Sequence, residues 1–335
     1  MGRLGVLSVA VWLLASGGAQ AQATGAGCTR ECLIGIAEEY LDALAAQDPK
    51  RVPLVPDLKY TENGQRLLTG DGIWNSISAR GTYLLHVADP VAGQVVTFST
   101  MREAGTPIIL AVRLKVEGKR ITEVETQVAR SENGAKAFEA LGSPRDAFSR
   151  LTAPADRMSR ADLVRTANMY FSGMQLNDGK GTYPFADACD RIENGNRTTN
   201  APGKPGASRP DPKTASNYSA MWSCREQFES GLLHFVSRIR DRRFVAVDEE
   251  RGLVMAFAFF DHDAGQSRTF QTPDGRTVTA GPTTPWTWQI AELFKVEKGL
   301  LHDIEAVLER VPYGMGSGWS SWEDAMSDKI QWSGK

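Results

Sequence analysis

The sequence contains little cysteine and little histidine, four residues of each in a chain of 335. None of these residues form a cluster with the spacing of a zinc site, so the sequence predicts no metal site. The glycine-rich loops of serine hydrolases, phosphate-binding proteins and dinucleotide-binding proteins are also missing. We therefore expect no cofactor.

An excess of either charge is lacking too, because 38 Lys and Arg stand against 40 Asp and Glu. A nearly neutral chain has no electrostatic footprint for a nucleic acid or an anionic membrane surface. After residue 23, no segment approaches the roughly 18–20 uninterrupted apolar residues of a membrane span. We expect neither partner.

Residues 1–23 have the pattern of a signal peptide. Arg3 precedes an apolar run from 4 to 15, and small residues in Ala-x-Ala spacing follow at 19–23. The sequence thus predicts a periplasmic or secreted protein. In an exported chain an even number of cysteines favours disulfides. We expect Cys28 to pair with Cys32 and Cys189 with Cys224, with the alternative that some stay reduced and buried.

The most informative feature that is present is an internal duplication. Glu-Asn-Gly occurs at 62–64 and again at 193–195. Upstream, Tyr40 and Tyr170 each stand eight residues before an Asp, and downstream Lys-Val-Glu recurs at 115–117 and 295–297. Shared motifs in the same order predict two copies of one domain.

We place the first domain at 28–130 and the second at 159–312, joined by a polar connector at 131–158. The second copy alone carries an insertion at 197–218, which is rich in Pro, Gly and Ser and is predicted to be a mobile loop. Residues 313–335 form a tail with three tryptophans. We expect the tail to be a strap on the domain surface, or alternatively a lid over a pocket.

Each copy is predicted to begin with a helix and end with long strands. Apolar residues from Leu33 to Leu44 recur at helical spacing, and a similar stripe follows the capping residue Ser159. The β-rich runs come later in each copy and predict an antiparallel meander: 94–101, 107–116 and 120–129, then 253–261, 286–296 and 300–309. This is an α+β plan, in which a curved sheet wraps around a helix and leaves a cavity.

A helix ending in Tyr-x3-Leu-x3-Asp, followed by an acidic turn and a meander, resembles the SnoaL-like and ketosteroid-isomerase-like branch of the nuclear-transport-factor-2-like superfamily. The tandem form resembles secreted bacterial and fungal two-domain proteins. The resemblance implies a cone-shaped α+β barrel in each copy, paired through the sheets within one monomer or in a homodimer. It also implies an oxyanion-stabilising tyrosine at Tyr40 and Tyr170, and a proton-shuttling carboxylate near Glu62 and Glu193.

The two copies differ at positions that could carry chemistry. Strand alternation places Glu292 on the same face as Trp288, Ile290 and Phe294, whereas the matching face of 108–116 is wholly apolar. The same argument places His302 on an apolar face of 300–308. An acid and an imidazole in an apolar cavity are suited to proton transfer near neutral pH.

Our hypothesis is an acid/base site of Glu292, His302 and Glu193, with Tyr170 as hydrogen-bond donor to an oxyanion. It would act as a cofactor-free lyase or isomerase on a small apolar or aromatic molecule. The predicted ligand-contacting residues are Trp222, Trp288 and Phe294, with Tyr40, Glu62 and Trp74 in the first copy.

Other interpretations remain open. Glu292 could form an ion pair with Arg238 or Arg240, and His302 could be a satisfied core residue. The charged run at 238–243 is predicted to be solvated, and Asp261-His262-Asp263 to be a loop at a strand end. At the level of function, the alternatives are a non-catalytic ligand-binding or accessory protein and a pure assembly module.

Overall fold

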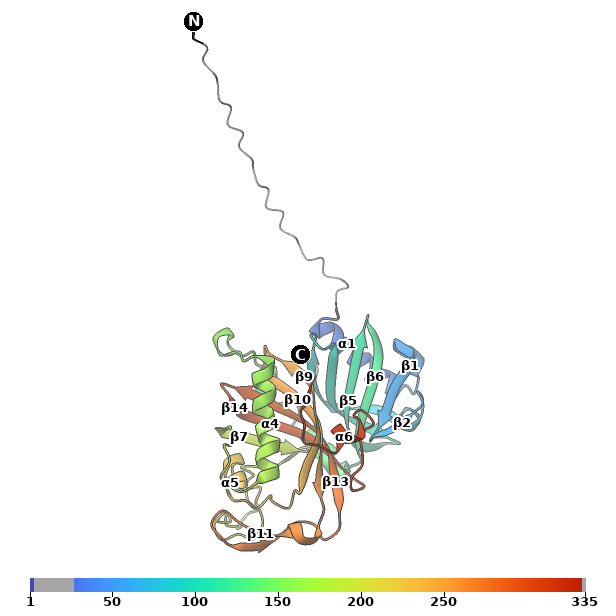
Figure 1. Ribbon diagram of the computed structural model, residues 1–335. Helices are drawn as coiled ribbons and strands as arrows, with labels where there is room; N and C mark the ends of the chain where they lie inside the picture. Colours follow the sequence, from blue (N-terminus) through green and yellow to red (C-terminus); the bar gives the residue numbers. More distant parts are fainter. Residues whose placement is uncertain (3–26, 333–335) are drawn as a thin grey trace.

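The computed structural model describes residues 1–2 and 27–332, and it is an α+β structure with two mixed sheets (Figure 1). The predicted signal peptide falls almost wholly outside the described residues. Within the described part, no helix is long and apolar enough to cross a membrane.

The first half consists of one long helix and a six-stranded sheet with the strand order β2-β1-β6-β5-β4-β3. Its elements are α1 (Arg30–Ala45), β1 (Leu54–Glu62), β2 (Gln65–Leu67), β3 (Ile77–Asp89), β4 (Gln94–Glu103), β5 (Thr106–Glu117) and β6 (Arg120–Ala129). The three predicted strand runs are confirmed as β4, β5 and β6. A short 3-10 helix, η2 (Gly72–Asn75), precedes β3.

The second half repeats this plan. Its elements are α4 (Arg160–Leu176), β7 (Phe185–Glu193), β8 (Asn196–Arg197), α5 (Cys224–Glu229), β9 (Arg238–Asp248), β10 (Leu253–His262), β13 (Trp286–Glu297) and β14 (Leu300–Val311). The hairpin of β11 (Thr269–Gln271) and β12 (Thr277–Thr279) is additional, and so is β15 (Gln331–Trp332), which gives the order β15-β9-β10-β13-β14-β7-β8. The connector holds two short helices, α2 (Glu132–Ala140) and α3 (Asp146–Ser149), and the tail holds α6 (Trp322–Ala325).

The sheets differ from the predicted antiparallel meander. In each half the first strand lies parallel to the last, β1 beside β6 and β7 beside β14, so both sheets are mixed. The prediction missed this parallel pairing because a meander pairs only strands that are consecutive in the sequence, whereas the first and last strands of each half are far apart in the sequence. Each sheet is open, with two ends in its strand order.

Both predicted helices are present, and α4 begins after the predicted capping residue Ser159. Thr29 caps α1 and the Ser159 hydroxyl accepts a hydrogen bond from the Asp162 amide at the start of α4. The apolar stripe of each helix is buried in its own half, so each half has a separate core between helix and sheet. Both predicted disulfides are present, Cys28–Cys32 and Cys189–Cys224.

The two Asn-Gly turns close tight hairpins and bind the neighbouring parallel strand. Asn63 and Asn194 have positive φ angles, as type I′ hairpin turns require. Each side chain also bonds to the neighbouring parallel strand: Asn194 accepts from the Leu308 amide and donates to its carbonyl, both at 2.9 Å, and Asn63 does the same with Val128. The turn thereby fixes the carboxyl end of β1 and β7, where Glu62 and Glu193 stand.

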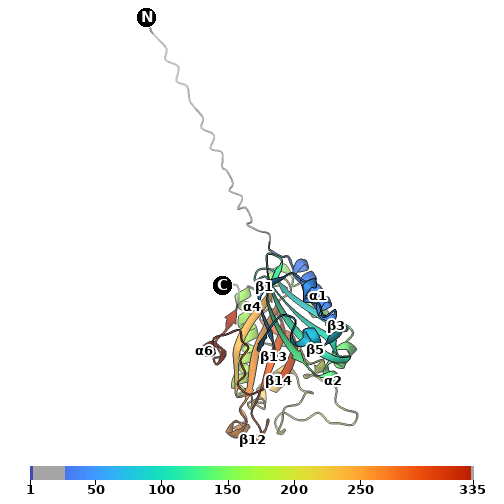
Figure 2. The same ribbon diagram turned by 90° about the vertical axis from the view of Figure 1, so that its right-hand side faces the viewer.

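The two sheets pack face to face, with α1 and α4 on the outside (Figure 2). A third apolar core lies between the sheets and draws residues from both halves, among them Phe98, Phe257 and Leu293. Even-numbered residues of β13 such as Ile290 face their own half, and odd-numbered ones such as Leu293 face the other half. The alternation predicted for this strand is confirmed.

Two reciprocal ion pairs join the halves. Arg30, the first residue of α1, pairs with Asp248 at the end of β9, and Arg160, the first residue of α4, pairs with Asp89 at the end of β3. Both contacts are bidentate and both aspartates are buried. Matching residues that contact each other crosswise are the mark of a pseudo-two-fold interface.

The prediction for the charged run at 238–243 is wrong, because Arg240, Asp241, Arg242 and Arg243 are all buried. Arg240 pairs with Asp261 at 2.8 Å and Arg243 with Glu125 of the first half at 2.6 Å. Burial of these charges is tolerated because each of the two arginines has a carboxylate partner, and these partners are too distant in the sequence to be recognised from it.

The tail is a strap across both halves, not a lid. Asp241 accepts hydrogen bonds from Ser317, Ser320 and Gln331 of the tail. On the first half, the Trp319 indole donates to Thr61 at 2.9 Å and lies under the Lys59 ammonium. The expectation of a surface strap is confirmed.

Candidate functional site

The second half contains a cavity of about 80 Å³ between α4 and the concave face of its sheet. Its walls come from α4, β7, β10, β13, β14 and the segments at 218 and 233–236. The lining residues are Met174, Arg191, Glu193, Tyr218, Leu233, Phe235, Val236, Phe260, His262, Trp288, Ile290, Glu292 and Leu308.

Glu292 lies at the centre of the sheet and in the cavity wall. Its side chain is 2% exposed and its Oε2 has no hydrogen-bond partner. Burial raises the pKa of Glu292 to about 8, with a further contribution from the charge of Glu193, while Arg191 and a hydrogen bond with Tyr170 act in the opposite direction. At neutral pH this group is therefore mainly a neutral acid.

Arg191 is the cation of the site, and the sequence analysis missed it. Its guanidinium is buried and contacts Glu193 at 3.0 Å. It also donates to the Tyr170 hydroxyl at 3.0 Å and to Gln227 at 2.6 Å. Burial alone would lower the pKa of Arg191, but its interactions with Tyr170, Glu193 and Glu292 raise it.

A signal for Arg191 was present in the duplication. Two residues before the Glu of each Asn-Gly turn, the first copy has Tyr60 and the second has Arg191. Strand β5 of the first half corresponds to β13 of the second half, and Val112 on β5 stands at the position of Glu292 on β13. At these two positions the first half thus has neither an acid nor a cation. Comparing the strand before each turn would have revealed the difference between Tyr60 and Arg191.

Glu193 and Tyr170 lie beside Arg191, as a compact group with Glu292. Glu193 lines the cavity, whereas the Tyr170 hydroxyl reaches Arg191 from within the aromatic core. Burial raises the pKa of Tyr170 well above its ordinary value. The structure brings together three of the four residues of the acid/base hypothesis.

His302 is not part of this group. The pairing of β13 with β14 passes from Leu301 to Asp303 and leaves His302 as the extra residue of a β-bulge. Leu301 takes the core position instead, so strict alternation from Ile304 fails here. Thr122 occupies the same bulge in the first half, between Ile121 and Glu123.

His262 supplies the imidazole that the cavity does have. Its Nδ1 lies 3.1 Å from the Phe260 carbonyl, which can only accept, so the proton is on Nδ1 and Nε2 is free to accept. Burial lowers the pKa of His262 to about 4, and the ring is neutral. The expectation of a strand-end loop missed it, because β10 extends through His262.

Aromatic rings surround the cavity. His262 stacks on Trp286 at 4.0 Å between centroids, Trp286 contacts Trp288, and Phe235 contacts both Tyr218 and His262. Planar rings at this density favour a flat apolar or aromatic ligand.

The predicted ligand contacts divide into two groups. Trp288 lines the cavity, but Phe294 packs behind it in the core and Trp222 is buried in a separate cluster with Leu232 and Phe270. In the first half, Tyr40 packs against Trp74 inside the core. Glu62 accepts a hydrogen bond from the Ile73 amide.

The predicted ion pair of Glu292 with Arg238 or Arg240 is absent, because both arginines bind Asp261. Within the described residues, no group of three His, Cys, Asp or Glu side chains could hold a metal ion. The cavity thus offers acid, cation and imidazole groups from the protein itself.

A search of the curated proteins found no match to this chain. A family model matches twice, over residues 27–128 and 156–308, which coincide with the two structural halves. Since these matches cover most of the sequence, the chain belongs to the family described as Domain of unknown function (DUF8021).

Proposed function

We propose that the second half binds a small, flat, apolar or aromatic molecule and acts on it by cofactor-free proton transfer, as a lyase or isomerase does. The observation that carries this proposal is Glu292, a buried acid with an unpartnered oxygen in the wall of an aromatic cavity. Buried groups without partners are costly, and they persist where a ligand uses them.

The surrounding groups divide the chemistry. Glu292, neutral near pH 7, donates a proton to an oxygen of the ligand on which negative charge develops. Arg191 and the Tyr170 hydroxyl, which are hydrogen-bonded to each other beside Glu292, stabilise that negative charge. Glu193 or His262 accepts the proton that the ligand loses, since both have acceptor atoms in the cavity wall.

In this proposal the first half is a structural partner. Its corresponding positions are Tyr60 and Val112, and its interior is filled by rings such as Tyr40 and Trp74. Each half would be a SnoaL-like domain whose open sheet forms a cone around the helix. The face-to-face sheets would make the single chain a pseudo-dimer that needs no second copy.

We further propose that the protein works in the periplasm or outside the cell. Two disulfides persist in an oxidising compartment and are reduced in the cytosol.

The test begins with the wild-type protein incubated in a native small-molecule extract, followed by mass spectrometry of the retained compound. That compound is then given to wild type and to Glu292→Gln. We expect turnover to fall by at least about a hundredfold, because a general acid contributes about 10²–10⁴-fold. Glu305→Gln is the matched control, since Glu305 is also buried but lies at the interface of the sheets.

Retention of the compound with no turnover by wild type would favour the alternative, a ligand-binding or accessory protein. Equal turnover by wild type and Glu292→Gln would end the acid/base proposal.

A further inference from the structure

The cavity is partly open to solvent, but its volume is smaller than any ligand that its aromatic walls would suit. Its volume of about 80 Å³ is below the roughly 150 Å³ of a cavity that admits benzene. Typical ligand sites enclose about 300–1,000 Å³. A ligand can therefore enter only if a wall moves.

Most walls are held by sheet ladders or by α4, and the exceptions are the segment 233–236 and Tyr218. Tyr218 belongs to the insertion found only in the second copy, and beyond Arg197 no strand pairing fixes the backbone of this insertion. The side chain is 43% exposed yet still lines the cavity, so it stands at the boundary between cavity and solvent. Its ring lies 6.2 Å from that of Phe235.

The hydroxyl of Tyr218 is close enough to Glu193 and Arg191 to interact with their charges. Burial raises the pKa of its hydroxyl, and the charge of Glu193 adds to this effect. The residue thus combines a ring that closes the mouth with a hydroxyl near the acid/base residues.

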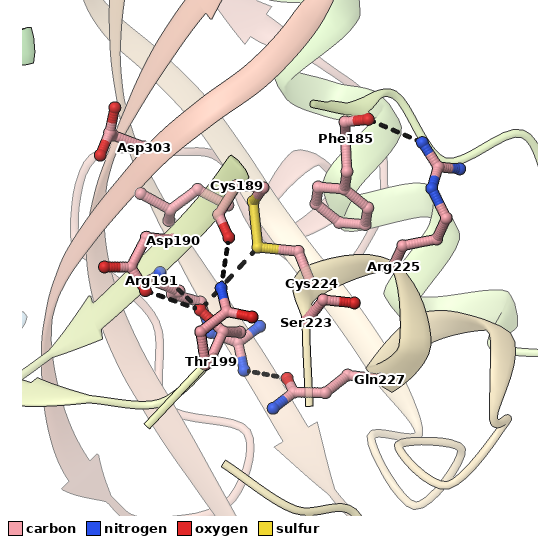
Figure 3. Close-up of a disulfide and its surroundings, with 12 residues drawn as sticks. Phe185, Cys189, Asp190, Arg191, Thr199, Ser223, Cys224, Arg225, Gln227 and Asp303 are labelled. Atoms are coloured by element: carbon pink, nitrogen blue, oxygen red, sulfur yellow. Dashed lines mark hydrogen bonds between the residues drawn. A yellow bond between two sulfur atoms is a disulfide. The ribbon is translucent and has the colours of Figure 1, made fainter. Parts of the chain in front are cut away.

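Both ends of the insertion are anchored. Gln227 donates to the carbonyls of Thr198 and Ser219, at 2.7 and 2.8 Å, while its oxygen accepts from Arg191. The Cys189–Cys224 disulfide holds α5, which carries Gln227, against β7, which carries Arg191 (Figure 3). The anchor of the insertion is therefore attached to the cation of the site.

The middle of the insertion rests on the β11–β12 hairpin instead of the main sheet. Arg276, in the turn of that hairpin, donates to the carbonyls of Pro212 and Ala215, at 3.0 and 2.7 Å. Tyr218 lies between this contact and the anchor at Ser219. Movement of the segment from 212 to 218 would displace the ring without breaking a strand ladder.

We propose that Tyr218 is the gate of the cavity and the residue that determines the size of its ligand, held closed by Gln227 on one side and Arg276 on the other. This inference rests on the proposed binding site of the second half, but it does not depend on any reaction there. A copy without the insertion has no such gate.

The test uses the full-length protein and two neutral probes, phenol and 2-naphthol, with affinities from titration calorimetry. Tyr218→Ala should bind 2-naphthol at least about tenfold more tightly than wild type does, because one ring of space in an apolar pocket has a large effect. Tyr218→Phe should keep the wild-type preference for phenol, since the ring remains. Tyr313→Ala is the control, because Tyr313 is equally exposed but lies outside the cavity lining.

A second variant tests gating separately from size. Arg276→Ala should accelerate both association and dissociation of phenol while its affinity stays within about twofold, because Arg276 contacts the insertion and not the cavity. Unchanged rates in this variant would remove the gating role.

The same size preference in Tyr218→Ala and wild type, including no binding by either, would overturn the role of Tyr218. A shifted preference together with unchanged turnover in Glu292→Gln would instead preserve the gate and remove the proposed chemistry.

Discussion

Glu292 and Arg191 are the residues by which the two copies differ in chemistry. A buried carboxylate without compensation is costly, and the second half limits that cost in two ways. The pKa of Glu292 is raised so that the group is neutral, and the charge of Glu193 is balanced by Arg191. The first half avoids the cost with Tyr60 and Val112.

The first prediction concerns the pH dependence of activity. Since Glu292 is proposed to donate a proton and its pKa is raised to about 8, turnover should fall as pH rises through 8. The measurement is kcat/KM of the retained compound between pH 6 and 9.5. A profile that rises through the same range would show that Glu292 acts as a base.

A second prediction converts the second site into the first. The double variant Arg191→Tyr, Glu292→Val introduces the residues that stand at the matching positions of the first half. It should remain folded and be more stable than Arg191→Tyr alone, because an apolar side chain then replaces Glu292, whose buried Oε2 has no partner. Ligand retention should be lost.

The single variant Arg191→Tyr is its control. It leaves Glu193 and Glu292 without their cation and should unfold more easily than wild type by about 3 kcal/mol in urea titrations. A double variant less stable than this single variant would contradict the interpretation.

At the scale of elements, the Asn-Gly turns fix where each acidic strand end lies. The third prediction is that Asn194→Ala and Asn63→Ala each lower the free energy of unfolding by about 2 kcal/mol, because a positive φ and two hydrogen bonds are affected. Asn→Gly at either position should cost about half as much, since glycine keeps the turn. Only the Asn194 variants should also weaken ligand binding, through Glu193.

The sequence predicted the elements that have a strong local pattern. The stripes of α1 and α4 and strands β4, β5, β13 and β14 follow from periodicity, and the cap at Ser159 follows from the local capping pattern. The orientation of Glu292 followed from alternation over a strand with no irregularity near it.

Features that depend on contacts distant in sequence could not be predicted in this way. A bulge at His302 shifts the alternation of β14, and its presence is visible only in the pairing with β13. The burial of 238–243 depends on Glu125, on Asp261 and on a tail some eighty residues away. Parallel pairing of β7 with β14 likewise joins the ends of the domain.

At the scale of the whole molecule, the interface between the sheets contains its own buried acid. Tyr83 of the first half donates to Glu305 of the second at 2.5 Å, and the Glu305 Oε2 has no partner. Burial raises the pKa of Glu305 to about 7. Its counterpart in the first half, Glu125, instead binds Arg113 and Arg243, which with other interactions lower its pKa.

The fourth prediction follows from this shift. The raised pKa means that the folded protein holds a proton that the unfolded chain releases, so the contribution of Glu305 is complete below pH 4.5 and is lost as pH rises to 7. The loss is at most about 3 kcal/mol. Glu305→Gln should therefore have a flatter stability profile between pH 4.5 and 7 than wild type in urea titrations, and an equally steep profile would contradict the assignment.

We expect the reciprocal ion pairs to make the two halves one unit of folding. Asp89 is buried, binds Arg160 of the second half and also accepts from the Val247 amide, so Asp89→Ala leaves a partly buried guanidinium without its carboxylate. The fifth prediction is that this variant loses about 3 kcal/mol, that Asp89→Ala, Arg160→Ala recovers part of the loss, and that both retain a single thermal transition. Since the core between the sheets contains residues from both halves, separating the two sheets would expose apolar side chains such as Phe98 and Phe257.

Two separate calorimetric transitions in wild type would contradict this prediction. They would show that each half folds alone and that the reciprocal ion pairs only hold two already folded halves together.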